Sequence, residues 1–411
     1  MSADFDVVVV GGGLAGACTA ALLTHHGRLP PGRVGLLSDE LPLVPAPGDP
    51  AELRVVAISR ASERVLRAAA AWPLLDPTRL CAYERMRVWH ETSAPTASSA
   101  LNFDAADISE PNLGFIAENS ALVHACHESF KATGGNRIEG MLERLSVGAG
   151  QVSLHCGGGR ELTARLVVGA DGSQSVVRAA VGLNARVLDY RQLAIVATVR
   201  TSRSHENTAW QRFLRTGPLA LLPLFDGHSS IVWSVDQPAA RELLDLPEGS
   251  FNERLTAACD EVLGSTGLVS QRISFPLRSL AAHSYVAARC ALVGDAAHVV
   301  HPLAGQGANL GLLDAAALCE SVADAIAERE DPGALRALRR YEQQRRTHNL
   351  MMDAAMSAFR AGFAASVGPG ALLLNTALGA VNRSGALKRL LARQAMGTVG
   401  ELPRYARSSP G

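Results

Sequence analysis

Residues 4–27 read DFDVVVVGGGLAGACTAALLTHHG, and this stretch decides the fold. Its four consecutive valines are β-branched and too few for a helix, so they predict a buried strand. The glycines that follow have the G-x-G-x-x-G spacing, and the next residues have a helical composition. The first glycine permits a tight turn, the second lets backbone approach a pyrophosphate, and the third lets the helix pack on the strand. The candidate dinucleotide contacts are Gly11, Gly13, Leu14, Ala15 and Gly16.

The residue after the second predicted strand decides how an adenosine ribose is held. The strand from Arg33 to Leu37 is expected to end at an acid that accepts hydrogen bonds from the ribose hydroxyls. The chain has Ser38 at this position, and Asp39 and Glu40 follow it. Two alternatives stay open: Asp39 takes the role after a small shift, or Ser38 makes a weaker bond.

Two more junctions between a strand and a helix carry glycines. Residues 166–178 read LVVGADGSQSVVR, where a strand runs into Asp171 and Gly172. Residues 291–314 read ALVGDAAHVVHPLAGQGANLGLLD, where a strand precedes a glycine-rich loop and a long apolar helix. One Asp-Gly pair is usually a turn, but three such junctions in this order are not expected by chance. They extend the prediction from a dinucleotide to a flavin.

The third junction suits a flavin for chemical reasons. The carboxylate of Asp295 is well placed to accept hydrogen bonds from a ribityl chain. The loop after it aims backbone N–H groups and a helix dipole at the region where a reduced flavin carries negative charge. His298 and His301 in this loop are interpreted as hydrogen-bonded structural groups rather than general bases. The candidate residues are Gly294, Asp295, Gly305, Gln306, Gly307, Ala308 and Asn309.

The composition indicates a multi-domain globular protein. The chain has 411 residues, of which 47% are apolar and 19% charged, so a sizeable core is available. Lys and Arg number 39, as do Asp and Glu, so no nucleic-acid partner is expected. The seven cysteines form no C-x-x-C pair, so reduced thiols are predicted. No histidine pair has further metal-ligating residues at a suitable spacing, so no metal site is predicted. Asp4 and Asp6 argue against a secretion signal and favour the cytoplasm.

The C-terminal region is first apolar and then basic. Residues 361–382 carry no charge, but Pro369 and Gly370 interrupt them, so two short buried helices are predicted rather than a membrane span. Residues 383–411 hold six basic residues and one acidic residue. This tail either docks peripherally on an anionic membrane surface or is a solvated end. The segment RALRRYEQQRRTHN (336–349) is interpreted as a helix with its Arg and Glu side chains in solvent.

These motifs together resemble a known family. GGGLAG (11–16), VVGADGSQSVVR (167–178) and VGDAAHVVHPLAGQGANLG (293–311) are similar to the three fingerprints of the single-component flavin aromatic hydroxylases, which share the para-hydroxybenzoate hydroxylase fold. HPLAGQGANLGLLDAAAL (301–318) looks like the signature of the ubiquinone-biosynthesis hydroxylases. The resemblance runs from about residue 5 to about residue 397. Further similar stretches are RVVAISRASERVL (54–66), LGFIAENSAL (113–122), TAWQRFLRTGPLALLPL (208–224) and FPLRSL (275–280).

The resemblance implies roles for individual residues. It places the FAD adenosine and pyrophosphate at the first glycine motif and Arg54 near the FAD phosphates. It implies that Asp171 and Gly172 serve both FAD and the reduced nicotinamide. It also implies that Asp295 binds the ribityl chain and that the backbone of residues 307–309 meets the flavin pyrimidine.

Other implied or interpreted positions lie around the flavin ring. The resemblance implies that Pro302 lies beside the ring, on the side where oxygen and substrate meet, and Gln306 is a candidate for positioning at the same place. Glu118 and Asn119, at a strand-to-helix junction, are interpreted first as a helix cap and an entry-turn acid. A flavin-side contact is the second interpretation.

The predicted fold class is α/β: a Rossmann-like FAD-binding domain, an inserted mixed or antiparallel β-sheet substrate domain, and a C-terminal helical segment. Residues 188–235 read as successive strands of the inserted sheet. Trp210, Phe213, Leu221, Leu222 and Trp233 in it either line a channel for a prenyl tail or form sheet core. The expected divisions are 1–80, 104–182 and 275–330 for FAD, 81–103 and 183–274 for substrate, and 331–411 for the helical region with its basic tail.

The resemblance implies an FAD-dependent monooxygenase. The resemblance further implies that NAD(P)H and O2 are used to hydroxylate a polyprenylated phenol or benzoquinol on the way to ubiquinone, through a flavin C4a-hydroperoxide, with the cofactor performing the difficult step. A ubiquinone-biosynthesis complex is a possible partner. The alternatives are a hydroxylase of a small soluble phenol, a flavin reductase of prenyl double bonds, and a non-enzymatic FAD-bearing scaffold or sensor.

Overall fold

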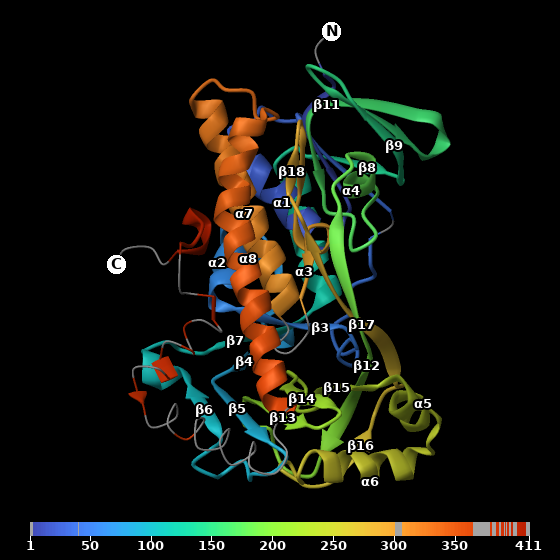
Figure 1. The fold of residues 1–411 in the computed structure, drawn as a ribbon, viewed down its shortest axis with the longest axis vertical. Coiled ribbons are helices and arrows are strands. Elements are labelled where there is room, and N and C mark those ends of the chain that lie inside the picture. Colours follow the sequence, from blue (N-terminus) through green and yellow to red (C-terminus); the bar gives the residue numbers. More distant parts are fainter. Residues whose placement is uncertain are drawn as a thin grey trace.

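The computed structural model describes residues 3–39, 41–300 and 306–364, together with shorter pieces between residues 379 and 407. These residues form two large sheets at opposite ends of the long axis, with a small third sheet between them (Figure 1). The long helix α8 (Leu335–Ala364) runs along this axis beside the sheets (Figure 1). The arrangement confirms the predicted α/β class.

The first large sheet has eight strands in the order β18-β19-β11-β1-β2-β8, with β10 paired to β11 and β9 paired to β10. Its centre is parallel, because β1 pairs in parallel with both β11 and β2. Five of the six residues of β1 are buried, as expected for a strand that is covered on both faces. The strands are β1 (Phe5–Val10), β2 (Val34–Ser38), β8 (Asn136–Glu139), β9 (Leu142–Val147), β10 (Val152–Cys156), β11 (Arg160–Gly169), β18 (Val286–Ala287) and β19 (Cys290–Leu292).

Helix α1 packs against this sheet and against two further helices. Helix α1 (Leu14–His26) contacts both α3 (Asn119–Ala132) and α7 (Gln306–Ala327). The small residues Ala17, Ala20 and Ala21 of α1 have no exposed surface, which allows this close packing. The strand, turn and helix expected from the first 27 residues are therefore present.

The second large sheet has nine strands in the order β20-β17-β12-β15-β14-β13-β5-β6, with β16 paired to β12. It is mixed, as predicted, because β13 and β5 are parallel while the other pairs are antiparallel. Its strands are β5 (Arg85–His90), β6 (Leu101–Asp104), β12 (Ala185–Thr201), β13 (Thr208–Leu214), β14 (Gly217–Pro223), β15 (Ser229–Asp236), β16 (Thr266–Leu268), β17 (Ile273–Ala282) and β20 (His298–Val299). Residues 275–282, which the sequence placed with the FAD-binding part, are hydrogen-bonded into this second sheet.

Two helices cover one face of the second sheet. Helices α5 (Gln237–Asp245) and α6 (Glu248–Ala258) form a core with the sheet, in which Leu221 and Trp233 pack with Phe251, and Trp210 packs at its edge. These three sheet residues therefore belong to sheet core rather than to a channel. Leu222 instead packs in a separate cluster with Cys81 and Leu224, and Phe213 is buried.

A small third sheet and several shorter helices complete the described fold. A three-stranded sheet has the order β3-β7-β4, and its strands are β3 (Val55–Ser59), β4 (Cys81–Tyr83) and β7 (Gly114–Glu118). Further α-helices in residues 41–300 are α2 (Arg60–Ala68) and α4 (Val176–Ala180). The 3-10 helices are η1 (Trp72–Leu74), η2 (Pro77–Arg79), η3 (Ala105–Ile108), η4 (Gly157–Gly159), η5 (Gly294–Ala296) and η6 (Arg404–Ala406).

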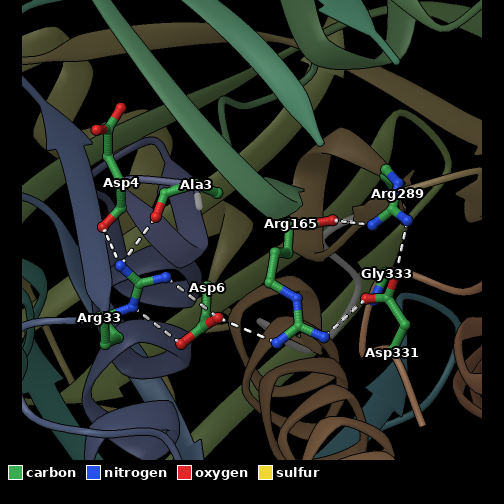
Figure 2. Close-up of polar contacts among 8 residues, drawn as sticks. All are labelled: Ala3, Asp4, Asp6, Arg33, Arg165, Arg289, Asp331 and Gly333. Atoms are coloured by element: carbon green, nitrogen blue, oxygen red, sulfur yellow. Dashed lines mark hydrogen bonds and ion pairs between the residues drawn. The ribbon is translucent and has the colours of Figure 1, made fainter. Parts of the chain in front are cut away.

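A chain of ion pairs holds the amino-terminal side of the first sheet together (Figure 2). Asp6 at the start of β1 pairs with Arg33, which precedes β2, and with Arg165 of β11, both at 3.1 Å. Asp331, between α7 and α8, pairs with Arg165 at 3.4 Å and with Arg289 at 2.6 Å. The network therefore joins three parallel strands to the turn between the two long helices.

The C-terminal region differs in part from its prediction. Arg345 of α8 has no exposed side-chain surface. The prediction that the Arg and Glu side chains of this segment lie in solvent is therefore wrong for Arg345. The two short helices expected in residues 361–382 fall largely outside the described residues. Within the described part of the chain, no helix has the length and apolar character needed to cross a bilayer. All seven cysteines are free and buried, as predicted.

Candidate functional site

A large cavity opens at the carboxyl ends of strands β1, β2, β11 and β19. Its volume is about 900 Å³, which is the scale of a cofactor site. Ligands of open α/β sheets bind at this edge of the sheet. Most of the predicted cofactor residues line this cavity. They are Gly11, Gly13, Leu14, Ala15, Ser38, Asp39, Arg54, Asp171, Gly172, Gly294, Asp295, Gly307 and Ala308.

The first glycine motif shapes one wall of the cavity. Gly11 has a φ of +109°, and a Cβ atom on it would lie 2.3 Å from the carbonyl oxygen of Ala170. A Cβ atom on Gly16 would lie 1.9 Å from the carbonyl oxygen of Gly11, so Gly16 packs α1 on the turn and does not line the cavity. A Cβ atom on Gly13 would have no neighbour within 4 Å. Gly13 therefore leaves open space where a phosphate can approach the backbone.

Both alternatives for the ribose contact lie at the cavity wall. The hydroxyl of Ser38 accepts a hydrogen bond from Nε of Arg137 at 3.2 Å, and the backbone carbonyl of Asp39 accepts one from Nη2 at 2.5 Å. Ser38 is buried and Asp39 is exposed. Arg137 therefore fixes the turn in which both candidate residues lie.

The second glycine junction is stabilised by the carboxylate of Asp171. It accepts hydrogen bonds from the hydroxyl of Ser175 at 2.5 Å and from the backbone N–H of Val177 at 3.1 Å. Arg178 of α4 then donates to the backbone carbonyl of Ala296 in η5 at 2.8 Å. The second junction is therefore tied directly to the third.

Asp295 extends from η5 into the cavity. Its side chain is exposed there although protein surrounds it on other sides. Burial raises the pKa of its carboxyl group, and the nearby charges of His298 and Arg54 oppose this shift without cancelling it. A polar ligand that donates hydrogen bonds to the carboxylate would stabilise its charged form.

The start of α7 forms another part of the cavity wall and lies beside the first glycine motif, because a Cβ atom on Gly311 would be 3.2 Å from the Cβ atom of Ala15. Gly307 and Ala308 line the cavity, and a Cβ atom on Gly307 would have no neighbour within 4 Å. The side chain of Asn309 points elsewhere, because it accepts from the N–H of Ser59 and donates to the carbonyl of Ala57, both at 2.9 Å. Gln306 is buried and does not line the cavity. Pro302 and Gly305 lie outside the described residues.

Several cavity residues were missed by the motifs. Asn119, for which a flavin-side contact is only the second interpretation, lines the cavity, and its backbone N–H donates to the carbonyl of Arg54 at 3.0 Å. Glu118 occupies the N-cap position of α3, as its first interpretation predicted, but its side chain makes no capping hydrogen bond. The carboxylate of Glu52 takes that place by accepting from the N–H of Ser120 at 3.1 Å. The other missed residues are Val10, Gly12, Leu37, Leu41, Pro42, Val123, Gly140, Met141, Leu142, Ala170, Gln174, Val176, Val299, Val300 and Gly311.

The missed residues carry little signal in a single sequence. Most are apolar or glycine, and only the fold brings the turn after β8 and the first turns of α3 to the same wall. Asn119 was detectable because it follows a predicted strand directly.

The arrangement fits FAD. The cavity is lined by the ends of four strands, and Gly13 keeps open a space that a side chain would occupy. The carboxylate of Asp295 lines it as an acceptor for a polyhydroxyl chain. The N-terminal residues of α7 also line it, and N–H groups at a helix start favour negative charge.

Comparison with known proteins agrees with this site. Residues 121–354 match the FAD binding domain family. The chain is 33% identical to 3-demethoxyubiquinol 3-hydroxylase of Escherichia coli, over 95% of this chain and 98% of that protein. It is 37% identical to ubiquinone hydroxylase UbiL of Rhodospirillum rubrum, over 98% of this chain and 93% of that protein.

A solved structure shows the same fold. The p-nitrophenol 4-monooxygenase PnpA of Pseudomonas putida superposes with a TM-score of 0.75 at 18% identity, over 96% of this chain and 99% of that one. The family match covers more than half of the chain, and each of the two relatives aligns over nearly all of it. The chain belongs to the FAD-dependent monooxygenases of the ubiquinone-biosynthesis hydroxylase family.

Proposed function

We propose that this enzyme uses NAD(P)H and O2 to add one hydroxyl group to the ring of a polyprenylated phenol or benzoquinol. The observation that carries the proposal is the 900 Å³ cavity with its three glycine junctions, taken together with relatives named as ubiquinone hydroxylases. When bound, FAD supplies the redox and oxygen-activating chemistry. The residues of this chain bind and orient FAD and keep water from the reacting edge.

Individual residues have distinct proposed tasks. Gly11 and Gly13 admit the pyrophosphate, and Leu14 and Ala15 begin the helix whose N-terminus faces it. Asp39, which is exposed to the cavity, accepts from the adenosine ribose and Ser38 supports the turn. Arg54 lies near the FAD phosphates. The remaining proposed contacts are Asp171, Gly172, Gly294, Asp295, Gly307 and Ala308.

The third junction has the proposed task of holding the flavin end of the cofactor. Asp295 accepts hydrogen bonds from the ribityl hydroxyls, and the backbone at the start of α7 faces the flavin pyrimidine. Asn309 belongs to the first turn of α7, Gly16 acts indirectly through packing, and Gly305 stays a proposed contact on the basis of the motif. Pro302 is proposed to position the reacting edge of the ring, and Gln306, which is buried and does not line the cavity, is proposed to act there only indirectly.

Association with a membrane surface or with other ubiquinone-biosynthesis enzymes is a further part of the proposal, and the prenylated substrate supports it. Part of the basic tail is engaged within the fold, because Lys388 pairs with Asp107 at 2.7 Å and Arg404 pairs with Glu320 at 3.7 Å. Sedimentation with anionic vesicles measures lipid binding by the wild type and by Lys388→Ser. Equal binding by the two proteins would indicate that the other basic residues of the tail bind the lipid.

A small soluble phenol is the second candidate substrate. The packing of Leu221 and Trp233 into the sheet core supports it, because these side chains do not line a channel for a tail. The quinone profile of a strain that lacks the gene separates the two candidates. Accumulation of a polyprenyl phenol that lacks one ring oxygen, reversed by the intact gene, supports the first. An unchanged ubiquinone pool supports the second.

A further inference from the structure

A buried ion pair lies directly behind the turn that carries Asp295. Asp314 of α7 and Arg345 of α8 have no exposed side-chain surface, and Nε of Arg345 donates to Oδ1 of Asp314 at 2.8 Å. A buried ion pair costs much desolvation energy and contributes little net stability compared with apolar packing. Its presence therefore needs a reason other than holding two helices together.

The second oxygen of the Asp314 carboxylate supplies that reason. Oδ2 accepts hydrogen bonds from the backbone N–H of Gly294 at 3.1 Å and from Nε2 of His298 at 2.5 Å. Gly294 immediately precedes Asp295, and His298 immediately precedes Val299, and both Asp295 and Val299 line the cavity. One oxygen atom thus fixes both ends of the turn from residue 294 to residue 298.

Other groups of α8 hold the same region. Asn349 donates to Oδ1 of Asp314 at 3.2 Å and accepts from Nη2 of Arg345 at 2.8 Å, which keeps both members of the pair in place. The hydroxyl of Tyr341 donates to the backbone carbonyl of Leu292 at 2.6 Å, at the end of the strand that leads into the turn. Helix α8 itself contributes no residue to the described cavity wall.

We infer that Arg345 and Asp314, with His298, are positioning residues that hold the Gly294–His298 turn in the geometry that binds FAD. The inference rests on the proposed place of FAD beside Asp295. Arg345 acts through Asp314, because it touches neither the cavity nor the turn. A carboxylate without its guanidinium partner would be a buried, poorly compensated charge, and the two bonds that it makes to the turn would change.

The test measures FAD affinity apart from stability. Arg345→Met is compared with a control variant, Arg289→Met. This control also breaks an ion pair, the partly buried one with Asp331, but Arg289 does not line the cavity. Each purified apoprotein is titrated with FAD by flavin fluorescence under conditions where circular dichroism shows it to be folded, and its urea midpoint is measured separately. We expect both variants to lose stability. Only Arg345→Met should lose FAD affinity, by roughly tenfold or more, with a changed midpoint potential of the bound flavin.

A second pair of variants covers the case in which Arg345→Met does not fold. His298→Gln keeps an N–H donor near the position of Nε2, whereas His298→Leu removes it. We expect His298→Gln to bind FAD within about threefold of the wild type and His298→Leu to bind it roughly tenfold more weakly. Equal FAD affinity in these two variants, or in wild type and folded Arg345→Met, would overturn the inference. A wild-type protein that binds no FAD would instead contradict the proposed function.

Discussion

Arg79 and Glu118 form a two-point ion pair, with Nε to Oε2 and Nη2 to Oε1 both at 2.7 Å. Both side chains are almost fully buried. Arg79 also donates to the backbone carbonyls of Ala46, Asp49 and Pro50, and its guanidinium lies 4.6 Å from the ring centroid of Phe225. The pair therefore joins the loop after β2, the end of β7 and the turn with Phe225 between β14 and β15.

We expect Arg79→Leu to lower the free energy of unfolding by on the order of 3 kcal/mol, because the charge of Glu118 would stay buried without a partner. Urea unfolding measures the change. The double variant Arg79→Leu, Glu118→Leu is the control and should recover part of the loss. If the double variant lost the full sum of the two single losses, the two residues would not interact as the structure indicates.

The two glycines Gly13 and Gly16 should respond oppositely to an added methyl group. In Gly16→Ala the new Cβ atom would lie 1.9 Å from the backbone carbonyl of Gly11, so we expect loss of stability or of folding. In Gly13→Ala the Cβ atom has no neighbour within 4 Å, so the protein should fold normally. It should bind FAD more weakly, because the methyl group occupies the space proposed for the pyrophosphate. Thermal melting and FAD titration of both variants check this, and a destabilised Gly13→Ala would contradict it.

Asp295→Ala should lose most of the affinity for FAD. The carboxylate is the proposed acceptor for the ribityl hydroxyls, and burial raises its pKa. FAD that donates hydrogen bonds to it favours the charged form, so affinity should fall as the pH falls through this raised pKa. Asp295→Asn is the control and should remove the part of the pH dependence due to this group. Full flavin occupancy in Asp295→Ala would refute the assignment.

Asp314 should contribute to stability at neutral pH and lose that contribution in acid. Burial by itself raises the pKa of its carboxyl group, but the charges of His298 and Arg345 and their hydrogen bonds outweigh burial and hold the pKa well below the ordinary value of 3.8. A group whose pKa is lower in the folded state stabilises the fold above its unfolded pKa, and this contribution disappears as the pH falls towards the folded pKa.

The corresponding variant is Asp314→Asn. We expect it to be less stable than the wild type at pH 7 and to show a smaller further loss on acidification below about pH 4. Urea midpoints of both apoproteins across this range measure the difference. Parallel pH profiles for the two proteins would show that Asp314 does not carry the acid dependence.

The site was predictable wherever a local motif sets the backbone. Gly11 has a φ of +109°, and Gly16 lies too close to a backbone carbonyl to carry a side chain. Only glycine fits at both positions, so the motif shows the same glycine spacing in the sequence. Asp295 was recognisable because it follows directly from a strand. Leu221 and Trp233 were ambiguous, because an apolar strand residue reads the same whether its face meets a ligand or helices α5 and α6.

The sequence by itself determined the α/β class, the three strand-to-helix junctions and the flavin family, because each depends on residues close together in the chain. Only the tertiary structure decided the partners of charged residues far apart in the chain. Arg345 reads as a solvated residue in an Arg-rich helix, yet it is fully buried against Asp314, 31 residues away. Whether a side chain is buried depends on which elements pack together in the fold. The spacing of residues along α8 does not predict which of its faces packs against α7, or that Arg345 and Asp314 support the turn with Asp295.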